Sequence, residues 1–174
     1  MPWKNGLGIT EEIVIFPDDS SVEDFNWRVS MAYVTADSIF SVFPGITRHM
    51  VILEGHMNLA LPDRTVHLSP EQNPLHFSGD TTVTASVVTG PVRDLNIMTR
   101  DKYYTAAVSR VRINAKNCFS GAEHILLATQ ILTVQADSQT YNLERYDALY
   151  VDSRTSNKDL ICNGECWIST ITQI

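Results

Sequence analysis

The sequence predicts an all-β fold. Apolar and polar residues alternate with a period of two along most of the chain, as in residues 27–34. The alternating segments are rich in valine, isoleucine, threonine and aromatic residues, which favour strands. No window of helical length carries an apolar stripe at i, i+3, i+4 and i+7. Many short strands at close spacing are typical of a β-sandwich or a β-barrel.

Short segments with this alternation follow one another along the chain, and each is expected to form a strand. They cover residues 27–34, 48–53, 57–61, 83–88, 93–98, 106–113, 123–129, 131–135, 148–151 and 167–172. Residue pairs that favour turns separate them. The expected turns are Pro44-Gly45, Glu54-Gly55, Pro62-Asp63, Gly79-Asp80, Gly90-Pro91 and Asn163-Gly164.

A weak internal repeat divides the chain into two halves. The first succession of strand-like segments is 48–53, 57–61, 66–68 and 73–77, and the second is 123–127, 131–134, 141–143 and 146–151. Two similar runs of hairpins predict two packed β-units, about 1–100 and about 101–174, within a single compact domain. Chance similarity among strands is the alternative, because the two runs share few identities.

Size and charge limit the function classes. A length of 174 residues fits one domain with a sizeable core. The net charge of -7 and the absence of a basic stripe argue against nucleic acid or an anionic membrane as partner. No apolar run approaches the ~20 residues of a membrane helix. The first residues contain no apolar signal core, so secretion is not expected. The three cysteines, an odd number, are expected to be reduced thiols in a cytoplasmic protein.

One segment of the second half resembles the strand–turn–strand pattern of the cupins. Residues 143–151 carry it, with Arg145-Tyr146-Asp147 where cupins often have Pro-Gly-Asp. Cupins are small jelly-roll barrels whose open mouth holds a ligand or a metal. The missing glycine is a departure, because glycine suits the tight geometry of that turn.

A larger set of motifs resembles the HutD/Ves family of the cupin superfamily. In family order they are residues 3–13 (WKNGLGITEEI), 25–32 (FNWRVSMA), 40–48 (FSVFPGITR), 53–55 (LEG), 77–80 (FSGD) and 94–100 (DLNIMTR). Leu7 departs from the glycine or alanine often found there, and the short segment that usually precedes the first motif is missing. The resemblance implies a double-stranded β-helix of bicupin type, a cytoplasmic location and no established enzymatic activity. It links HutD members to bacterial histidine utilisation, with a suspected sensing role, and Ves members to stress responses.

The spacing of the first half argues against a metal cupin. Metal cupins place His-x-His and then a glutamate ahead of a strand that ends in glycine, in the pattern E-x6-G. Counting back from Gly55 places Arg48 at the glutamate position, and residues 42–44 near the histidine positions cannot bind a metal. Glu123 could stand for that glutamate in the second half, but no His-x-His precedes it. We therefore expect neither metal nor cofactor, and solvated or core positions for the five histidines.

Arg48 is the most informative candidate for ligand binding. It shares a strand face with Met50, which places it on the expected inner side of the barrel. A buried arginine needs a partner, and its planar fork suits a carboxylate. That partner is either a ligand anion or an internal carboxylate such as Asp94, Glu11 or Glu12.

Further candidates surround Arg48 in the expected barrel. Arg28, beside small residues of its strand, is either a second cation of the pocket or part of a salt bridge at the mouth. Asn96 shares a strand face with Asp94 and offers an amide to a ligand or to a bulge in the barrel wall. The candidate ligand-binding residues are Arg48, Arg28, Asn96, Asp94, Ser41, which lies near Arg48 in its motif, and Trp3, Lys4 and Asn5, which could fold over the mouth as a lid.

These residues favour a non-enzymatic sensor or regulatory protein that binds a small carboxylate. The resemblance suggests urocanate, formylglutamate or formate as candidates. The alternative is a metal-independent isomerase or hydrolase acting on a small acidic metabolite, although no catalytic triad or nucleophile elbow is present. A third hypothesis is a scaffold with a filled barrel mouth and a protein partner. A small anionic metabolite is the expected partner, and a homodimer is compatible with this interpretation.

Overall fold

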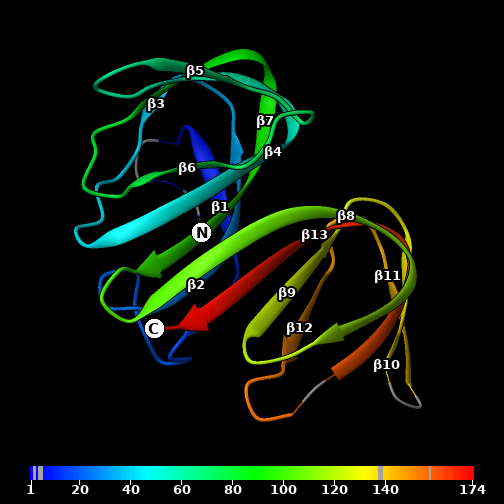
Figure 1. The fold of residues 1–174 in the computed structure, drawn as a ribbon. Helices are drawn as coiled ribbons and strands as arrows, with labels where there is room; N and C mark the ends of the chain where they lie inside the picture. The colour runs from blue at the N-terminus through cyan, green and yellow to red at the C-terminus, as the bar shows by residue number, and fades with distance from the viewer. Residues whose placement is uncertain (2, 4–5, 137–138, 157) are drawn as a thin grey trace. The chain divides into compact units, whose positions relative to one another are not determined.

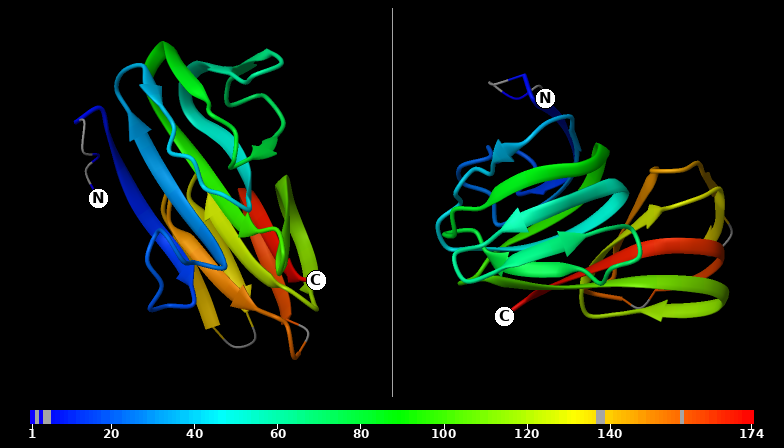
Figure 2. Two further views of the ribbon diagram at one scale, coloured as in Figure 1. Left: turned by 90° about the vertical axis from the view of Figure 1, so that its left-hand side faces the viewer. Right: turned by 90° about the horizontal axis from the view of Figure 1, so that it is seen from above.

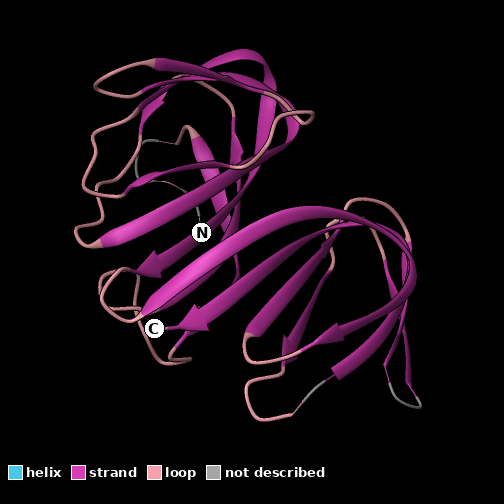
Figure 3. Cartoon of the chain, viewed as in Figure 1, coloured by secondary structure: helices cyan, strands magenta, loops and turns pink. Residues whose placement is uncertain are grey.

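The structure of the chain, a computed structural model, describes residues 1, 3, 6–136, 139–156 and 158–174. These residues form two compact units, Met1–Tyr104 and Thr105–Ile174, each built around one antiparallel sheet (Figure 1). Both sheets curl strongly, as two further views show (Figure 2). The described residues form strands and loops without a helix (Figure 3), so none of them forms a helix that could cross a membrane. The all-β prediction is confirmed.

The sheet of the first unit has seven strands. They are β1 (Gly8–Phe16), β2 (Trp27–Val34), β3 (Ser38–Ile39), β4 (Ile46–Ala60), β5 (Thr65–Leu68), β6 (Leu75–Ser78) and β7 (Thr84–Arg100). Their order is β1-β2-β7-β4-β5, while β3 pairs with β7 and β6 with β4. The long strands β4 and β7 therefore lie at the centre, and β2 and β4 flank β7 on its two sides.

β4 and β7 run through two of the expected turns. The pairing of β4 with β7 changes register at three places between Ile52 and Met57. Gly55 has a φ of 75°, and a Cβ there would lie 2.7 Å from the carbonyl oxygens of Thr89 and Pro91. The turns predicted at Glu54-Gly55 and Gly90-Pro91 are therefore wrong, because the glycine serves a bulge that bends the strand without ending it.

The bulge keeps both halves of β4 on the same core. Before it, Arg48, Met50 and Ile52 are buried, and after it Met57 and Leu59 are buried. Four of these five side chains belong to one apolar cluster, which excludes only Arg48. β4 thus carries one guanidinium into an apolar interior, although Val51 and Leu53 on its other face are buried as well.

The sheet of the second unit has six strands. They are β8 (Tyr104–Phe119), β9 (Glu123–Ala128), β10 (Leu132–Ala136), β11 (Gln139–Leu143), β12 (Ala148–Asp152) and β13 (Lys158–Gln173). Their order is β11-β10-β13-β9-β12, with β8 paired to β13. β13 runs through Asn163-Gly164, so the turn predicted there is also wrong.

The core of the second unit is apolar and contains two of the thiols. Leu126, Val134, Cys162 and Cys166 belong to one buried cluster, and burial raises the pKa of both thiols. The cupin-like turn before β12 survives the loss of its glycine, because Tyr146 itself adopts a φ of 75°. A non-glycine residue in this region carries a conformational cost that the surrounding structure must offset.

Candidate functional site

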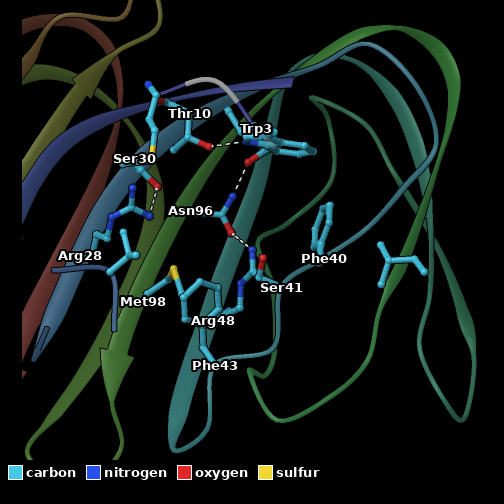
Figure 4. A pocket seen from close by; sticks show the side chains of 15 residues that line it. Trp3, Thr10, Arg28, Ser30, Phe40, Ser41, Phe43, Arg48, Asn96 and Met98 are labelled. Atoms are coloured by element: carbon cyan, nitrogen blue, oxygen red, sulfur yellow. Dashed lines mark hydrogen bonds between the residues drawn. The ribbon is translucent and has the colours of Figure 1, made fainter. Parts of the chain in front are cut away.

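A cavity of about 460 Å³ opens inside the first unit (Figure 4). Side chains from the N-terminal segment, from β1, β2, β4 and β7 and from the loop after β3 form its wall. The lining residues are Met1, Trp3, Thr10, Val22, Arg28, Ser30, Ala32, Ile39, Phe40, Ser41, Phe43, Arg48, Asp94, Asn96 and Met98. The volume suits a small metabolite in a mostly apolar site with a few polar groups.

Arg48 is the central cation of this cavity. Only 7% of the residue is exposed, and its Nη2 donates a hydrogen bond to Oδ1 of Asn96 at 2.7 Å. Its Nε is buried without a hydrogen-bond partner among the described residues. Burial lowers the pKa of Arg48 to about 10, which is still high enough to keep the guanidinium charged at neutral pH. Within the described residues, Arg48 has no carboxylate at ion-pair distance.

Three phenylalanine rings surround the Arg48 guanidinium. Its Cζ lies 5.1 Å from the ring centre of Phe40, 5.2 Å from that of Phe77 and 5.8 Å from that of Phe43. Such contacts attract a cation to the ring faces. They orient the guanidinium while leaving its N–H groups without carboxylate partners.

Asp94 and Asn96 continue the polar side of the cavity along β7. Asn96 Nδ2 donates a hydrogen bond to Asp94 Oδ1, so that the amide joins the carboxyl to the guanidinium (Figure 4). Asp94 Oδ2 is buried without a partner among the described residues. Burial raises the pKa of Asp94 to about 7, against the opposing effects of Arg48 and Asn96. Asp94 therefore changes charge near neutral pH.

Arg28 is a second cation, and it has the partner that Arg48 lacks. Its Nε lies 2.8 Å from Oε2 of Glu12 on the neighbouring strand β1. Its Nη1 donates a hydrogen bond to the Ser30 hydroxyl at 3.3 Å. Arg28 thus lines the cavity and also forms a salt bridge, so both of the roles considered for it from the sequence are compatible with its position.

Trp3 lies over one part of the cavity. Its Nε1 donates a hydrogen bond to the Thr10 hydroxyl at 2.7 Å. A Cβ on Gly8 would lie 3.0 Å from the Trp3 ring and 2.9 Å from a carbonyl oxygen of Tyr33, so glycine allows this close approach. The tryptophan expected in a lid is therefore held against β1, whereas Lys4 and Asn5 lie outside the described residues.

The cavity brings together most of the expected site residues. Arg28, Arg48, Asp94, Asn96, Trp3 and Ser41 all line it. Ser41 is exposed, and Glu11 lines a separate hollow on the surface. Their role in binding stays a prediction, because the geometry shows only that they converge.

Sequence reasoning missed the phenylalanine rings around Arg48. Phe40 and Phe43 lie in one motif, and Phe77 lies in another that is 34 or more residues away along the chain. β6 brings Phe77 opposite Arg48 on β4. The signal was the alternation of residues 75–78, which places Phe77 on the inner face.

The described residues contain no cluster of three or more histidine, cysteine, aspartate or glutamate side chains that could hold a metal. No histidine lines the cavity. The polar groups of the cavity are guanidinium, amide, hydroxyl and carboxyl groups, which suit recognition of an anion better than metal coordination.

Comparisons with known proteins agree with the motifs. The family model described as HutD matches residues 1–168. A curated protein named Ves, from Citrobacter koseri, is 40% identical over 100 residues, which are 56% of this chain and 51% of that protein. The match thus spans about half the length of this curated relative.

Solved structures show the same fold. HutD from Pseudomonas fluorescens SBW25, determined in a formate condition, is 30% identical with a TM-score of 0.87, over 100% of this chain and 93% of that one. A cupin 2 conserved barrel domain protein from Leptotrichia buccalis has a TM-score of 0.67 at 6% identity, over 96% of this chain and 89% of that one. The second likeness shows the fold alone, and it confirms the predicted cupin jelly roll.

Proposed function

Because this chain belongs to the HutD family, we propose that it is a non-enzymatic sensor or regulatory protein whose cavity binds a small carboxylate through Arg48. Binding would report the level of a metabolite without converting it. The resemblance to HutD and Ves proteins suggests histidine utilisation or a stress response as the setting of this role.

The buried Arg48 is the observation that carries this proposal. A guanidinium in an apolar interior is costly unless its charge and its donors are satisfied. Here Asn96 accepts a hydrogen bond from one N–H group, and phenylalanine rings lie against the guanidinium. No carboxylate lies at ion-pair distance among the described residues. A carboxylate entering the cavity would supply the missing charge and acceptor oxygens.

The cavity also limits the ligand. Its volume of about 460 Å³ suits a small metabolite, and rings and methyl groups line much of the remaining wall. Formate, which names the condition of the Pseudomonas fluorescens HutD structure, is the smallest carboxylate to test. Intermediates of histidine breakdown, such as urocanate and formylglutamate, carry the same group and form the panel to be tested.

A thermal-shift experiment tests the proposal. The chain is heated with formate, acetate, urocanate and formylglutamate, and with formamide and acetamide as uncharged comparisons. At least one acid is expected to raise the melting temperature in proportion to the logarithm of its concentration, because a ligand of the folded state stabilises by mass action, by about 2.7 kcal/mol at 100 times Kd.

Two variants of Arg48 complete the test. Arg48→Met keeps an apolar stem among the phenylalanine rings and is expected to abolish the shift, whereas Arg48→Lys keeps the charge without the fork and is expected to weaken it. Arg64→Met, at an exposed arginine outside the cavity, serves as the matched control. Equal shifts in wild type and Arg48→Met, or no shift with any acid, would count against the proposal.

Asp94 favours one second candidate, a metal-independent enzyme acting on an acidic metabolite. Its carboxyl lies in the cavity, and its pKa near 7 is suited to proton transfer at neutral pH. Incubation of each bound acid with the chain, followed by NMR of the mixture, separates the two functions. Turnover that disappears in Asp94→Asn would establish an enzyme, and unchanged acids would support a sensor.

A further inference from the structure

Four of the five histidines form two pairs, and one histidine of each pair lies on β4. His49 on β4 is directly opposite His76 on β6, with ring centres 5.7 Å apart. His56 on β4 lies beside His67 on β5, with ring centres 5.9 Å apart and an angle of 12° between the ring planes. Met50 follows His49 and Met57 follows His56, and both methionines belong to the apolar core, so that the histidines lie on the opposite face of the sheet from the cavity.

The His56–His67 pair has a feature that the other pair lacks. Nδ1 of His67 lies 3.0 Å from Oδ1 of Asn58, the residue opposite it in the β4–β5 ladder. Because the amide oxygen only accepts hydrogen bonds, His67 donates through Nδ1–H, and the lone pair of its neutral ring is then on Nε2. Hydrogen bonding of the distal nitrogen to an oxygen is how metal-binding histidines are commonly oriented.

The backbone fixes the position of His56. The register shifts on both sides of this residue belong to the bulge at Gly55, where any side chain would collide with two carbonyl oxygens. The bulge re-aims the following side chain, as bulges next to functional sites commonly do. His56 is half-buried and His67 is exposed, so the pair is anchored on one side and open to solvent on the other.

We propose that His56 and His67 bind a late divalent transition metal, with Cu²⁺ held most tightly, and that Asn58 positions the His67 ring. Neutral imidazole nitrogens suit copper, nickel and zinc, and affinity for such a ligand set peaks at Cu²⁺. Two adjacent histidines on neighbouring strands supply two ligands from a rigid sheet, and water fills the other coordination positions.

The nature of the pair defines what kind of site this is. No third histidine, cysteine, aspartate or glutamate completes a metal cluster among the described residues. A closed structural zinc site takes four protein ligands, so this is instead an open site from which the metal exchanges. It lies on the face of β4 away from Arg48, and it does not depend on carboxylate binding in the cavity.

The His49–His76 pair offers a built-in comparison. Its rings are as close as those of His56 and His67, but neither forms a hydrogen bond to another described residue. Without such a bond the tautomer and the ring orientation are not fixed. The expected Cu²⁺ affinity of this pair is therefore lower by about tenfold or more, which is the usual effect of removing the hydrogen-bond partner of a metal-binding histidine.

The test is a Cu²⁺ titration of the full chain at neutral pH, followed by calorimetry and by electron paramagnetic resonance. All samples carry Cys118→Ser, because Cys118 is an exposed thiol that would reduce or bind copper. We expect a tight site whose spectrum shows coordination by two imidazole nitrogens. His67→Gln and His56→Gln are expected to weaken it at least tenfold and to leave at most one imidazole nitrogen in its spectrum.

Two variants separate positioning from coordination. Asn58→Ala is expected to weaken Cu²⁺ binding about tenfold while keeping two nitrogens in the spectrum. His76→Gln is expected to leave the tight site unchanged. Melting temperatures without metal verify that each variant folds. A Cu²⁺ affinity unchanged in His67→Gln, a tight site lost in His76→Gln, or no two-nitrogen species in the parent chain would overturn the proposal.

Discussion

A guanidinium lies among the core side chains of the first unit, whereas an imidazole lies among those of the second. In the first unit Arg48 follows the face of Met50 and lines a cavity. In the second unit His124 follows the face of Leu126, packs edge-on against the Phe119 ring at 4.7 Å, and shares a hydrogen bond of 3.1 Å with the Thr170 hydroxyl. The first interior thus keeps a charge, and the second keeps a group that burial makes neutral.

The two β-units use the same short motif in different phase. The internal repeat aligns Arg48-His49 with Glu123-His124. In the first unit the first residue of the pair lies on the face of the apolar cluster, and in the second unit the second residue does, although the Glu123 face of β9 is buried as well. A shift of one residue reverses the two faces of a strand. Glu123, which could stand for the metal-binding glutamate but lacks the histidines before it, thus lies on the other face of β9.

Glu123 has a structural role on its own face of β9. The Tyr150 hydroxyl donates a hydrogen bond to Oε2 of Glu123 at 2.7 Å, and Nη1 of Arg154 lies 3.2 Å from Oε1. Both partners come from the chain around β12, which pairs with β9. The two units therefore show that a repeated strand motif need not form a repeated site. Which of two neighbouring side chains points into the apolar cluster depends on which face of the sheet each residue occupies.

The largest expected effect tests whether the second interior is a packed core. Leu126 is fully buried, so Leu126→Ala is expected to lower the free energy of unfolding by about 2–5 kcal/mol, through lost burial and the remaining cavity. Urea unfolding measures it. The carboxylate response of the folded variant should equal that of wild type. A loss below about 1 kcal/mol would mean that this interior is loosely filled.

The next effect concerns the buried carboxyl of the first unit. The pKa of Asp94 is about 7 in the folded chain and 3.8 for the ordinary group. The folded state binds this proton more tightly, so Asp94 lowers stability progressively as pH rises from about 4 to about 7. Near pH 8, Asp94→Asn is expected to have a free energy of unfolding about 1–3 kcal/mol higher than that of wild type, measured by urea unfolding. The difference is expected to be smaller near pH 5. An equal difference at both pH values would contradict this assignment.

The same titration should appear in ligand binding. Formate is fully ionised at every pH above about 5. A change of its affinity near neutral pH therefore arises from the titration of a group of the protein. Ionised Asp94 repels an anion held by Arg48, and formate affinity is therefore expected to fall several-fold as pH rises through about 7. Calorimetry across this range measures it. Asp94→Asn should bind formate with little pH dependence, and a wild-type affinity that rises with pH would argue against this arrangement.

The smallest effect concerns the imidazole of the second unit. Burial lowers the pKa of His124 below its usual 6.5, so the unfolded chain binds this proton more tightly. His124 therefore contributes stability above the usual pKa, and that stability is lost as pH falls through the lowered value. His124→Leu is expected to reduce the loss of stability on the acid side, in a comparison with the exposed His76→Gln by urea unfolding. Equal acid-side slopes in both variants would contradict a buried neutral His124.

Much of the first site could be predicted from local sequence. Alternation with a period of two placed Arg48 with Met50, and Asp94 with Asn96, on inner faces. The spacing to Gly55 identified Arg48 as the residue in place of a metal-binding glutamate. These inferences needed only a few neighbouring residues and one family motif.

The remaining features depend on pairing between distant strands. Phe77 meets Arg48, and His67 meets His56, only through the registers of β6 and β5 on β4. Nothing local specifies those registers, so the sequence alone predicts no pairing of the histidines. Glycine gave a second ambiguity, because Gly55 has the positive φ that suits a turn and a bulge equally. Only the pairing of β4 with β7 distinguishes the two.

The most direct measurement follows the Arg48 side chain itself. In ¹⁵N-labelled protein the Nε–H resonance of Arg48 is assigned by its loss in Arg48→Lys and is then followed during a formate titration. We expect this resonance to move progressively and to saturate with the calorimetric affinity, while that of Arg64, an exposed arginine outside the cavity, stays in place. An Arg48 resonance that does not respond while formate binds, or the absence of binding by formate and by every other acid of the panel, would contradict the proposed role of Arg48.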